Sequence, residues 1–303
     1  MQDRQGTRVR CAVTRILLGA VVALGSSMAA VAVRAADPTA QELHFLYEVN
    51  RARHDPPAWA AEYGLGSLTG GDLQPVTLIG VEPRPPLALN ATLVGSARFK
   101  AQEQAANDYF AHKSTVGPNF YWPNELVRNV FGYPLAATVP DPCIPSCYVL
   151  GDDSNQVESL AAGYGPGSAD RSLAINAVIG LIVDSGVPGL GHRVHLLGMN
   201  DFNAVFVEAG AGYGYSATAT YRNYWAFHTG VKASIETFLT GVAFADGNFN
   251  SVFDPGEGLA GVTVEAGAYS AITGASGGYS ISIPSGTHAV TCSGGAFSGT
   301  ASA

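Results

Sequence analysis

The chain has 303 residues, of which 47% are hydrophobic and 13% are charged, and its net charge is −8. This composition supports a sizeable core and excludes general disorder, and the length is typical of about two domains. The negative charge, with no basic stripe after the N-terminus, argues against nucleic acids bound through their phosphates.

The first 35 residues have the layout of a secretory signal peptide. Arginines come first, an apolar run follows over residues 16–33, and small alanines end the segment. We expect cleavage near Ala35, which predicts a secreted, extracellular or cell-surface protein with no stable membrane span after cleavage. A membrane anchor is the alternative, because the apolar run is near the minimal spanning length.

Three cysteines follow this segment. Cys143 and Cys147 are close enough in sequence to close a small disulfide loop in an oxidising compartment. A zinc site at this pair is disfavoured, because no further Cys or His lies beside it. Cys292 is then expected to be an unpaired thiol in a buried strand.

Helical patterns dominate the first two thirds of the chain. A capping-box pattern precedes a helix expected over residues 40–53. Asn90 is expected to cap a second helix that ends near Asp108. Ser168 is expected to cap a third helix over residues 169–183, whose apolar residues cover almost its whole circumference.

Strand patterns dominate the rest. Runs at residues 204–209 and 224–228 are joined by glycines and follow the helices, which favours an α+β fold. From about Phe238, after a linker at residues 232–237, short β-type runs alternate with turns as in a small antiparallel sandwich. These runs lie at residues 241–245, 262–266, 279–283 and 289–292. The end after Ser293 has too little apolar content to be predicted as ordered.

Three polar residues are candidates for one site: His112 after the second helix, Glu158 before the third, and His192 in the loop after it. Two imidazoles and a carboxylate suit zinc and leave a position for water. A structural role, in which these groups only satisfy one another, is the main alternative. The chain has neither a His-Glu-x-x-His motif nor a Gly-x-Ser-x-Gly elbow, so a zincin protease or α/β-hydrolase is not indicated.

Five segments carry a family resemblance. They are Leu46-Tyr-Glu-Val-Asn-Arg-Ala-Arg53, Tyr109-Phe-Ala-His112, Glu158-Ser-Leu-Ala-Ala-Gly163, Asp184-Ser-Gly-Val followed by Gly191-His-Arg-Val-His-Leu-Leu197, and Tyr224-Trp-Ala-Phe227. In their order and spacing, the chain from about Leu43 to Gly230 resembles the secreted bacterial branch of the CAP superfamily, also called SCP-like or PR-1-like. The resemblance predicts such a domain over residues 39–231.

This resemblance implies a three-layer α-β-α sandwich with a central cleft that contains two histidines and two acidic residues. By position these are His112, Glu158 and His192, with Asp184 as the candidate for the second acid. Some family members bind a divalent metal in this cleft, and others bind sterols or lipids elsewhere on the fold. The chain departs from the family pattern in having serine after Glu158 where asparagine is usual, and in lacking the tryptophan that usually precedes the second histidine.

An aspartate-rich loop near the C-terminus has the ligand spacing of an EF-hand loop. Oxygen donors fall at relative positions 1, 3, 5, 7, 9 and 12 of the loop, where the donor at position 7 is a backbone carbonyl. They belong to Asp246, Asn248, Asn250, Val252, Asp254 and Glu257. Calcium is the expected ion, although Ser251 replaces the usual glycine at position 6 and β-type runs replace the flanking helices. A solvated Asp/Asn turn is the alternative.

The segment around this loop resembles the SdrD B-like family of prealbumin-type β-sandwich modules, which implies a calcium-stiffened surface spacer over residues 238–303. The resemblance lies in Gly241-Val-Ala-Phe-Ala-Asp246, Asp254-Pro-Gly-Glu257, Leu259-Ala-Gly-Val-Thr-Val264, Gly277-Gly-Tyr-Ser280 and Pro284-Ser-Gly-Thr287. By this resemblance the chain stops one strand early, and we expect an incomplete or differently capped sandwich.

The sequence therefore predicts an exported binding protein for a small ligand, a lipid, a cell-surface component or a metal. One alternative is a peptidase or esterase in which His192 acts as base with Glu158 as its partner. Another is a structural adhesion module without a ligand in the cleft. Neither a nucleophile nor a complete metal set is evident in the sequence, so binding is favoured over catalysis.

Overall fold

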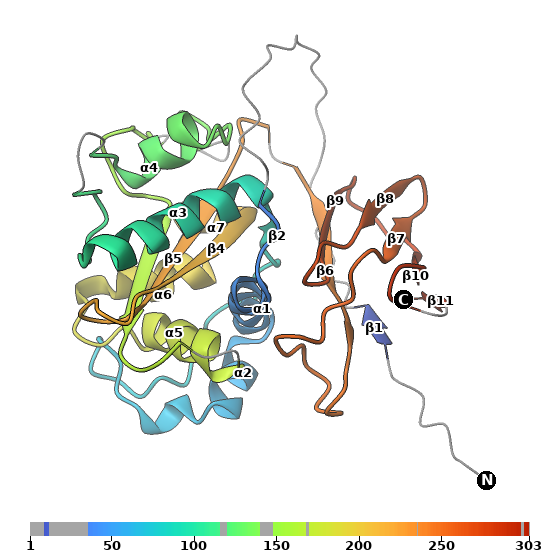
Figure 1. Ribbon diagram of the computed structural model, residues 1–303, viewed down its shortest axis with the longest axis horizontal. Helices are drawn as coiled ribbons and strands as arrows, with labels where there is room; N and C mark the ends of the chain where they lie inside the picture. The colour runs from blue at the N-terminus through green and yellow to red at the C-terminus, as the bar shows by residue number, and fades with distance from the viewer. Residues whose placement is uncertain are drawn as a thin grey trace.

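The structure is a computed structural model of the chain (Figure 1). It describes residues 9–11, 36–115, 120–139, 148–167, 170–234, 236–297 and 300–302. The expected cleavage site near Ala35, the cysteines at 143 and 147, and Ser168 lie outside the described residues. The fold is mixed α+β, as the sequence predicts.

Helices gather in the first part of the chain. They are α1 (Ala40–His54), α2 (Pro56–Glu62), η1 (Leu65–Ser67), α3 (Ala91–Asn107), α4 (Pro123–Glu125), η2 (Leu126–Val130), α5 (Ser172–Val183), η3 (Pro188–Leu190), α6 (Gly191–Leu197) and α7 (Asp201–Ala204). The predicted capping box of α1 is confirmed, because the Glu42 amide donates to Thr39 Oγ1 and the Thr39 amide to Glu42 Oε2. Asn90 likewise caps α3.

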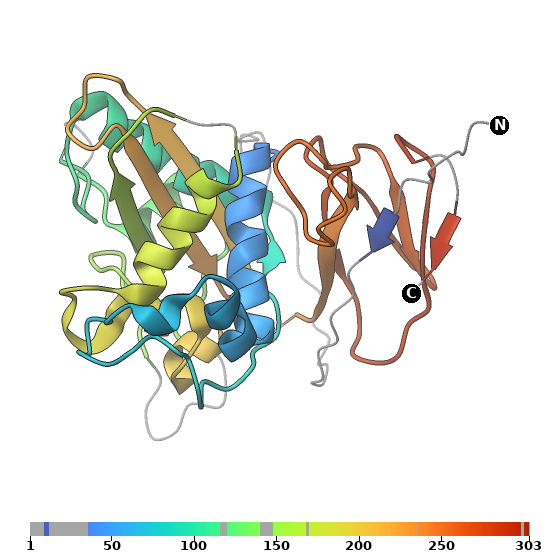
Figure 2. The same ribbon diagram turned by 90° about the horizontal axis from the view of Figure 1, so that it is seen from below.

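The helical part encloses a four-stranded sheet in the order β2-β4-β5-β3. Its strands are β2 (Ala88–Leu89), β3 (Glu158–Gly163), β4 (Glu208–Tyr215) and β5 (Asn223–Gly230). Strand β2 runs parallel to β4, and the other pairs are antiparallel. The helix α3 lies on one face of this sheet, whereas α1 and α5 lie on the other (Figures 1 and 2).

Glycine at every second position of β4 brings α3 into direct contact with the sheet backbone. A Cβ atom at Gly210 would lie 2.1 Å from the backbone nitrogen of Val94, and one at Gly212 would lie 2.0 Å from that of Arg98. The intervening residues, such as Ala211, face the core on the other side, with Phe45 of α1. The prediction that these glycines join two strands is wrong: residue 204 ends α7, and the glycines lie inside β4.

Two further sheets form the C-terminal part, with orders β1-β6-β9 and β11-β10-β7-β8. Their strands are β1 (Val9–Cys11), β6 (Phe238–Ala245), β7 (Thr263–Ala266), β8 (Tyr269–Ile272), β9 (Gly278–Ser282), β10 (Val290–Ser293) and β11 (Thr300–Ser302). Strand β1 lies within the predicted signal segment and pairs antiparallel with β6.

The C-terminal part corrects two expectations. Residues 300–302 form a strand that pairs with β10, so part of the Gly/Ser-rich end is ordered by backbone pairing although it has little apolar content. Cys292 is fully buried, as expected, but it is disulfide-bonded, so the expectation of an unpaired thiol is wrong. Strand β8 was not predicted; three of its four residues are exposed and none is buried, so it lacks the alternation of buried and exposed residues that marks a strand in a sequence.

The two parts of the chain pack against each other along α1 (Figure 2). Leu43 of α1 forms an apolar cluster with Val242, Phe244 and Phe253 of the C-terminal part. The ring of Phe253 also packs edge-on against Tyr47, with the ring centroids 5.6 Å apart. The helix α1 is therefore buried on two sides, by the sheet and by the C-terminal part.

Among the described residues, no single helix is long and apolar enough to cross a membrane, and one bent pair, α5 with residues 188–204, meets the criteria of length and composition.

A first prediction concerns the contact between α3 and β4. Substitution Gly212→Ala should lower the free energy of unfolding by about 3 kcal/mol or more, because the added carbon has no room beside the α3 backbone. Gly163→Ala in β3 is the matched control, since a Cβ there would meet nothing within 4 Å. Urea unfolding measures both variants, and equal stability of the two would contradict the prediction.

Candidate functional site

A cleft of about 380 Å³ lies at the edge strand β3. The segment after α3, the start of β3 and the helix α6 all contribute to it. Residues that line it include His112, Asn155, Glu158, Ser159, His192 and His195. The candidate residues His112, Glu158 and His192 thus line one cleft, although they are far apart in the sequence.

Glu158 is the central group on one side of the cleft. Its side chain is fully buried, and its two carboxylate oxygens lie 2.9 Å from His112 Nδ1 and 2.8 Å from His228 Nε2. Burial raises the pKa of Glu158, but the hydrogen bonds from the two histidines outweigh burial and hold the pKa below its ordinary value. The ionised carboxylate therefore fixes the orientation of the His112 ring.

Asp184 holds the second histidine. It ends α5 in a left-handed conformation with φ 55°, and its Oδ1 lies 2.7 Å from His192 Nδ1. The backbone amide of His192 donates to Asp184 Oδ2 at 3.0 Å, which ties the carboxylate to the first turn of α6. Arg193 donates to the carbonyls of Ile182 and Val183. It also pairs with Asp72.

Both cleft histidines have a carboxylate oxygen at Nδ1, and His112 Nδ1 also lies 2.9 Å from the side-chain nitrogen of Asn155. A carboxylate engages Nδ1 of His112 and of His192, and within the described residues no hydrogen bond occupies Nε2 of either ring. A carboxylate at one ring nitrogen fixes the tautomer and makes the other nitrogen a better metal ligand or proton acceptor.

The carboxylate of Glu158 is not available as a third metal ligand beside His112 and His192. Both its oxygens accept hydrogen bonds, from His112 and His228. Within the described ranges, no three His, Cys, Asp or Glu side chains are placed to hold a metal ion together. The structure therefore brings His112, Glu158 and His192 to one cleft, but not into one three-residue metal site.

A second polar chain crosses the opposite face of β3. His195 is buried between Ser159 and Thr229. Its Nδ1 lies 2.7 Å from Ser159 Oγ, and its Nε2 lies 2.7 Å from Thr229 Oγ1. Thr229 donates to the Val157 carbonyl, so we assign the proton to Nε2 of His195, and Nδ1 accepts from Ser159. Burial lowers the pKa of His195 to about 3, and nearby positive groups add to this effect.

His228 and Ser96 belong to the network around Glu158 and have no clear sequence signal. His228 Nε2 lies 2.8 Å from Glu158 Oε2, and its Nδ1 lies 2.8 Å from Ser96 Oγ. The partners Glu158 and His228 are 70 residues apart. Glu158 and His228 meet because β3 and β5 pair in a register that places them opposite each other. The sequence of either segment alone does not specify this register.

The aspartate-rich loop in the C-terminal part forms a closed turn. Asp246 is buried, and its Oδ2 accepts the Ser251 amide at 3.0 Å. Ser251 itself has φ 66°, the left-handed conformation that glycine adopts most readily. Glu257 closes the loop, because its two oxygens accept the amides of Gly247 and Asp254 at 2.9 and 3.0 Å.

One oxygen of this loop has no partner in the described part of the chain. Asp246 Oδ1 is buried and accepts no hydrogen bond there, whereas buried carboxylate oxygens normally have one. The side-chain amides of Asn248 and Asn250 both donate to Asp254 Oδ2, each at 2.7 Å. Carboxylate and amide groups of the predicted ligand set therefore do face one another inside the loop.

The same loop contacts the helical part. Asp254 Oδ1 lies 3.2 Å from Arg171 Nε, and the Phe253 amide donates to the Tyr47 hydroxyl at 3.2 Å. Positions 8 and 9 of the loop, Phe253 and Asp254, therefore lie at an interface and not at a free tip.

Comparison with protein-family models, curated proteins and solved structures finds no match to this chain. The resemblances to the CAP superfamily and to SdrD B-like modules accordingly stay proposals.

A second prediction concerns His195. The pKa of His195 is about 3 in the folded chain and 6.5 in an ordinary histidine. As the pH falls, His195 therefore binds a proton at a higher pH in the unfolded chain than in the folded chain. The free energy of unfolding should therefore decrease below about pH 6.5, with His195 contributing about 2 kcal/mol of that loss by about pH 5. The variant His195→Gln should show a shallower decrease.

Urea unfolding at about pH 7.5 and about pH 5 measures this difference. The exposed residue His54 provides the control, and His54→Gln should retain the pH dependence of the wild-type protein. An unchanged slope in His195→Gln would show that His195 does not stay neutral in the folded chain.

Proposed function

We propose that this chain is an exported, noncatalytic binding protein, built as a CAP-like three-layer α-β-α sandwich followed by an SdrD B-like β-sandwich. Its cleft binds a divalent transition metal such as zinc, or a small polar ligand, and its C-terminal loop binds calcium. The observation that carries the cleft assignment is the pair of histidines, His112 and His192, each held at Nδ1 by a carboxylate in one cleft.

Zinc is the metal that this donor set favours in the cleft. Zinc accepts neutral imidazole nitrogens, and metal-binding histidines commonly donate their other N–H to a carboxylate. In this proposal His112 and His192 bind the metal through Nε2. Glu158 and Asp184 orient them, and water or a bound molecule supplies the remaining donors.

Binding is favoured over the hydrolase alternative because the cleft lacks an activated nucleophile. Ser159 lines the cleft, but its hydrogen-bond partner His195 has a pKa lowered to about 3, which makes it a weak base near neutral pH. His192 is not hydrogen-bonded to any described serine, cysteine or threonine side chain that could attack a substrate.

Calcium fits the C-terminal loop on the chemistry of its donors. Calcium prefers carboxylate and carbonyl oxygens, and the loop buries Asp246 with one oxygen unpartnered among the described residues. The predicted donors are Asp246, Asn248, Asn250, Val252, Asp254 and Glu257. The amide oxygens of Asn248 and Asn250 accept the backbone amides of Asn250 and Val252, and each oxygen has a second lone pair for an ion. A bound ion would neutralise the carboxylates that the loop gathers.

The third prediction tests the cleft. Calorimetric titration of zinc into the full chain, in excess calcium, should reveal one site that is weakened at least about tenfold in His112→Ala and in His192→Ala. His288→Ala is the matched control, because His288 is a partly exposed histidine of the C-terminal part whose hydrogen bond among the described residues is to the nearby Pro284 carbonyl. Equal zinc affinity in all four proteins would contradict the assignment.

The fourth prediction tests the loop. Chelation by EDTA should lower the melting temperature of the full chain, because a ligand at about 100 times its Kd stabilises the folded state by about 2.7 kcal/mol. Asp246→Ala should abolish the response, since it removes the buried carboxylate. Glu265→Ala, at an exposed carboxylate of β7, should retain it. The same response in Asp246→Ala and wild type would exclude this loop as the calcium site.

A further inference from the structure

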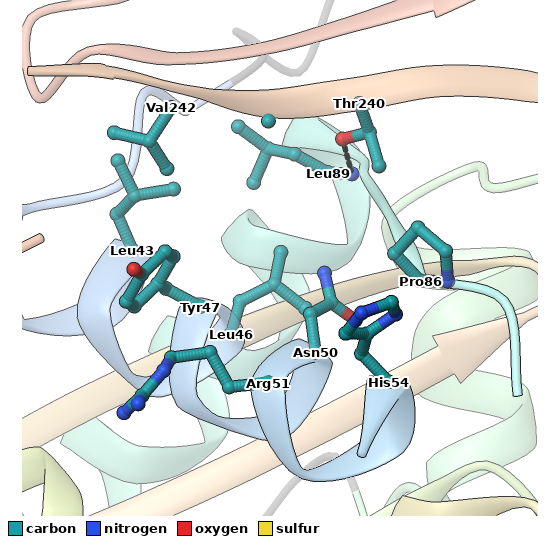
Figure 3. A pocket seen from close by; sticks show the side chains of 11 residues that line it. Leu43, Leu46, Tyr47, Asn50, Arg51, His54, Pro86, Leu89, Thr240 and Val242 are labelled. Carbon is teal, nitrogen blue, oxygen red and sulfur yellow. Dashed lines mark hydrogen bonds between the residues drawn. The ribbon is translucent and has the colours of Figure 1, made fainter. Parts of the chain in front are cut away.

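A second cavity, separate from the histidine cleft, lies between the two parts of the chain. Its volume is about 290 Å³, and it is bounded by α1, the segment before β2 and the strand β6 (Figure 3). None of its lining residues belongs to the cleft at β3. A ligand here would therefore share no residue with the proposed zinc or calcium sites.

The walls of this cavity are mainly apolar and come from both parts of the chain. Leu43 and Leu46 face it from α1, Leu89 from β2, and Val242 from β6 (Figure 3). Leu43, Leu46 and Val242 are buried almost completely. An apolar cavity of this kind at a boundary between two packed units is a typical place for a small ligand.

The two parts are in firm contact around the cavity. A Cβ atom at Gly278 of β9 would lie 2.9 Å from Leu43 Cδ1 and 2.8 Å from Leu89 Cδ2, so β9 packs closely on both leucines. The Leu89 amide also donates to Thr240 Oγ1 of β6 at 3.5 Å (Figure 3). The cavity is thus bordered by packed elements of both parts and is partly open to solvent.

One end of the cavity is polar but carries no unpaired full charge. Asn50 exchanges two hydrogen bonds with the backbone of Leu87, which leaves one hydrogen of its amide group for a ligand. His54, one turn further along α1, lines the same end of the cavity and has no hydrogen bond among the described residues. The guanidinium of Arg51 pairs with Glu48 and Glu62 and points away from the cavity (Figure 3).

We propose that this cavity binds a small uncharged amphipathic molecule. The apolar walls take a body of on the order of ten carbon-sized groups, since a water-sized group occupies about 30 Å³. A hydroxyl or carbonyl group on the ligand meets Asn50 and His54. A carboxylate is disfavoured, because the guanidinium among the described lining residues, that of Arg51, is already paired, and the C-terminal end of α1 repels negative charge.

Titration of 1-octanol into the full chain, followed by calorimetry and by the NMR signals of the leucine and valine methyl groups, tests this proposal. One saturable site is expected, with shifts at Leu43, Leu46 and Val242. Val242→Trp fills the cavity and should weaken binding at least about tenfold. Ile272→Trp is the matched control, because it adds the same ring at a residue that is 70% exposed in the same part of the chain, and it should bind normally.

The polar end is tested separately, with a variant that leaves the core unchanged. His54→Ala, at an exposed position, should weaken 1-octanol binding by about fivefold through the loss of one hydrogen bond. Octanoate should bind at least about tenfold more weakly than 1-octanol. Unsaturable binding, equal affinity in Val242→Trp and Ile272→Trp, or octanoate binding as tightly as 1-octanol would each overturn the proposal. The proposed zinc and calcium ligands lie outside this cavity, so all variants are compared at one calcium concentration, and failure of a metal assignment does not decide this outcome.

Discussion

The histidine cleft depends on the direct contact between α3 and the glycine face of β4. Without side chains at Gly210 and Gly212, the helix lies on the sheet backbone, and this places Ser96 and Lys100 of α3 against the central strands. Ser96 then meets His228 of β5, and His228 in turn meets Glu158 of β3. The positive charge of buried Lys100 also acts on Glu158 and favours its ionised form. A packing constraint on backbone atoms is thus transmitted through hydrogen bonds to the orientation of one cleft histidine.

The other wall of the cleft, which contains Asp184 and His192, is stabilised by local contacts within one loop. Asp184 and His192 are only eight residues apart, and the chain between them folds back through residues with positive φ, including Gly186 and Gly189. Arg193 anchors this loop to the last carbonyls of α5. One wall therefore rests on long-range sheet pairing and the other on a local turn. The cleft exists because the fold brings these two independently stabilised walls together.

This difference explains what the sequence predicts. Local rules find the capping box of α1, the Asn90 cap and the turn after Asp184, because their partners lie within a few residues of one another. The pairs Glu158–His228 and Ser159–His195 depend on strand register and helix docking, and no local pattern specifies these. The alternating glycines of β4 were visible in the sequence, but their meaning depends on a helix that arrives from more than a hundred residues away.

The C-terminal loop combines candidate ligands for a cation with packing contacts to α1, and the sequence reveals only the candidate ligands. Its spacing identifies candidate donors for a cation, but it gives no sign that Phe253, inside the same loop, packs against His44 and Tyr47 of α1. Arg171 approaches Asp254, one of the predicted calcium donors, from the helical part. A calcium ion in the loop and the guanidinium of Arg171 would therefore both bind the carboxylate of Asp254. Because α1 also forms a wall of the cavity at Leu43 and Leu46, the position of this loop affects the space between the two parts. Calcium in the loop and a ligand in that cavity would each favour the docked arrangement of the two parts, so the two binding events are expected to reinforce each other.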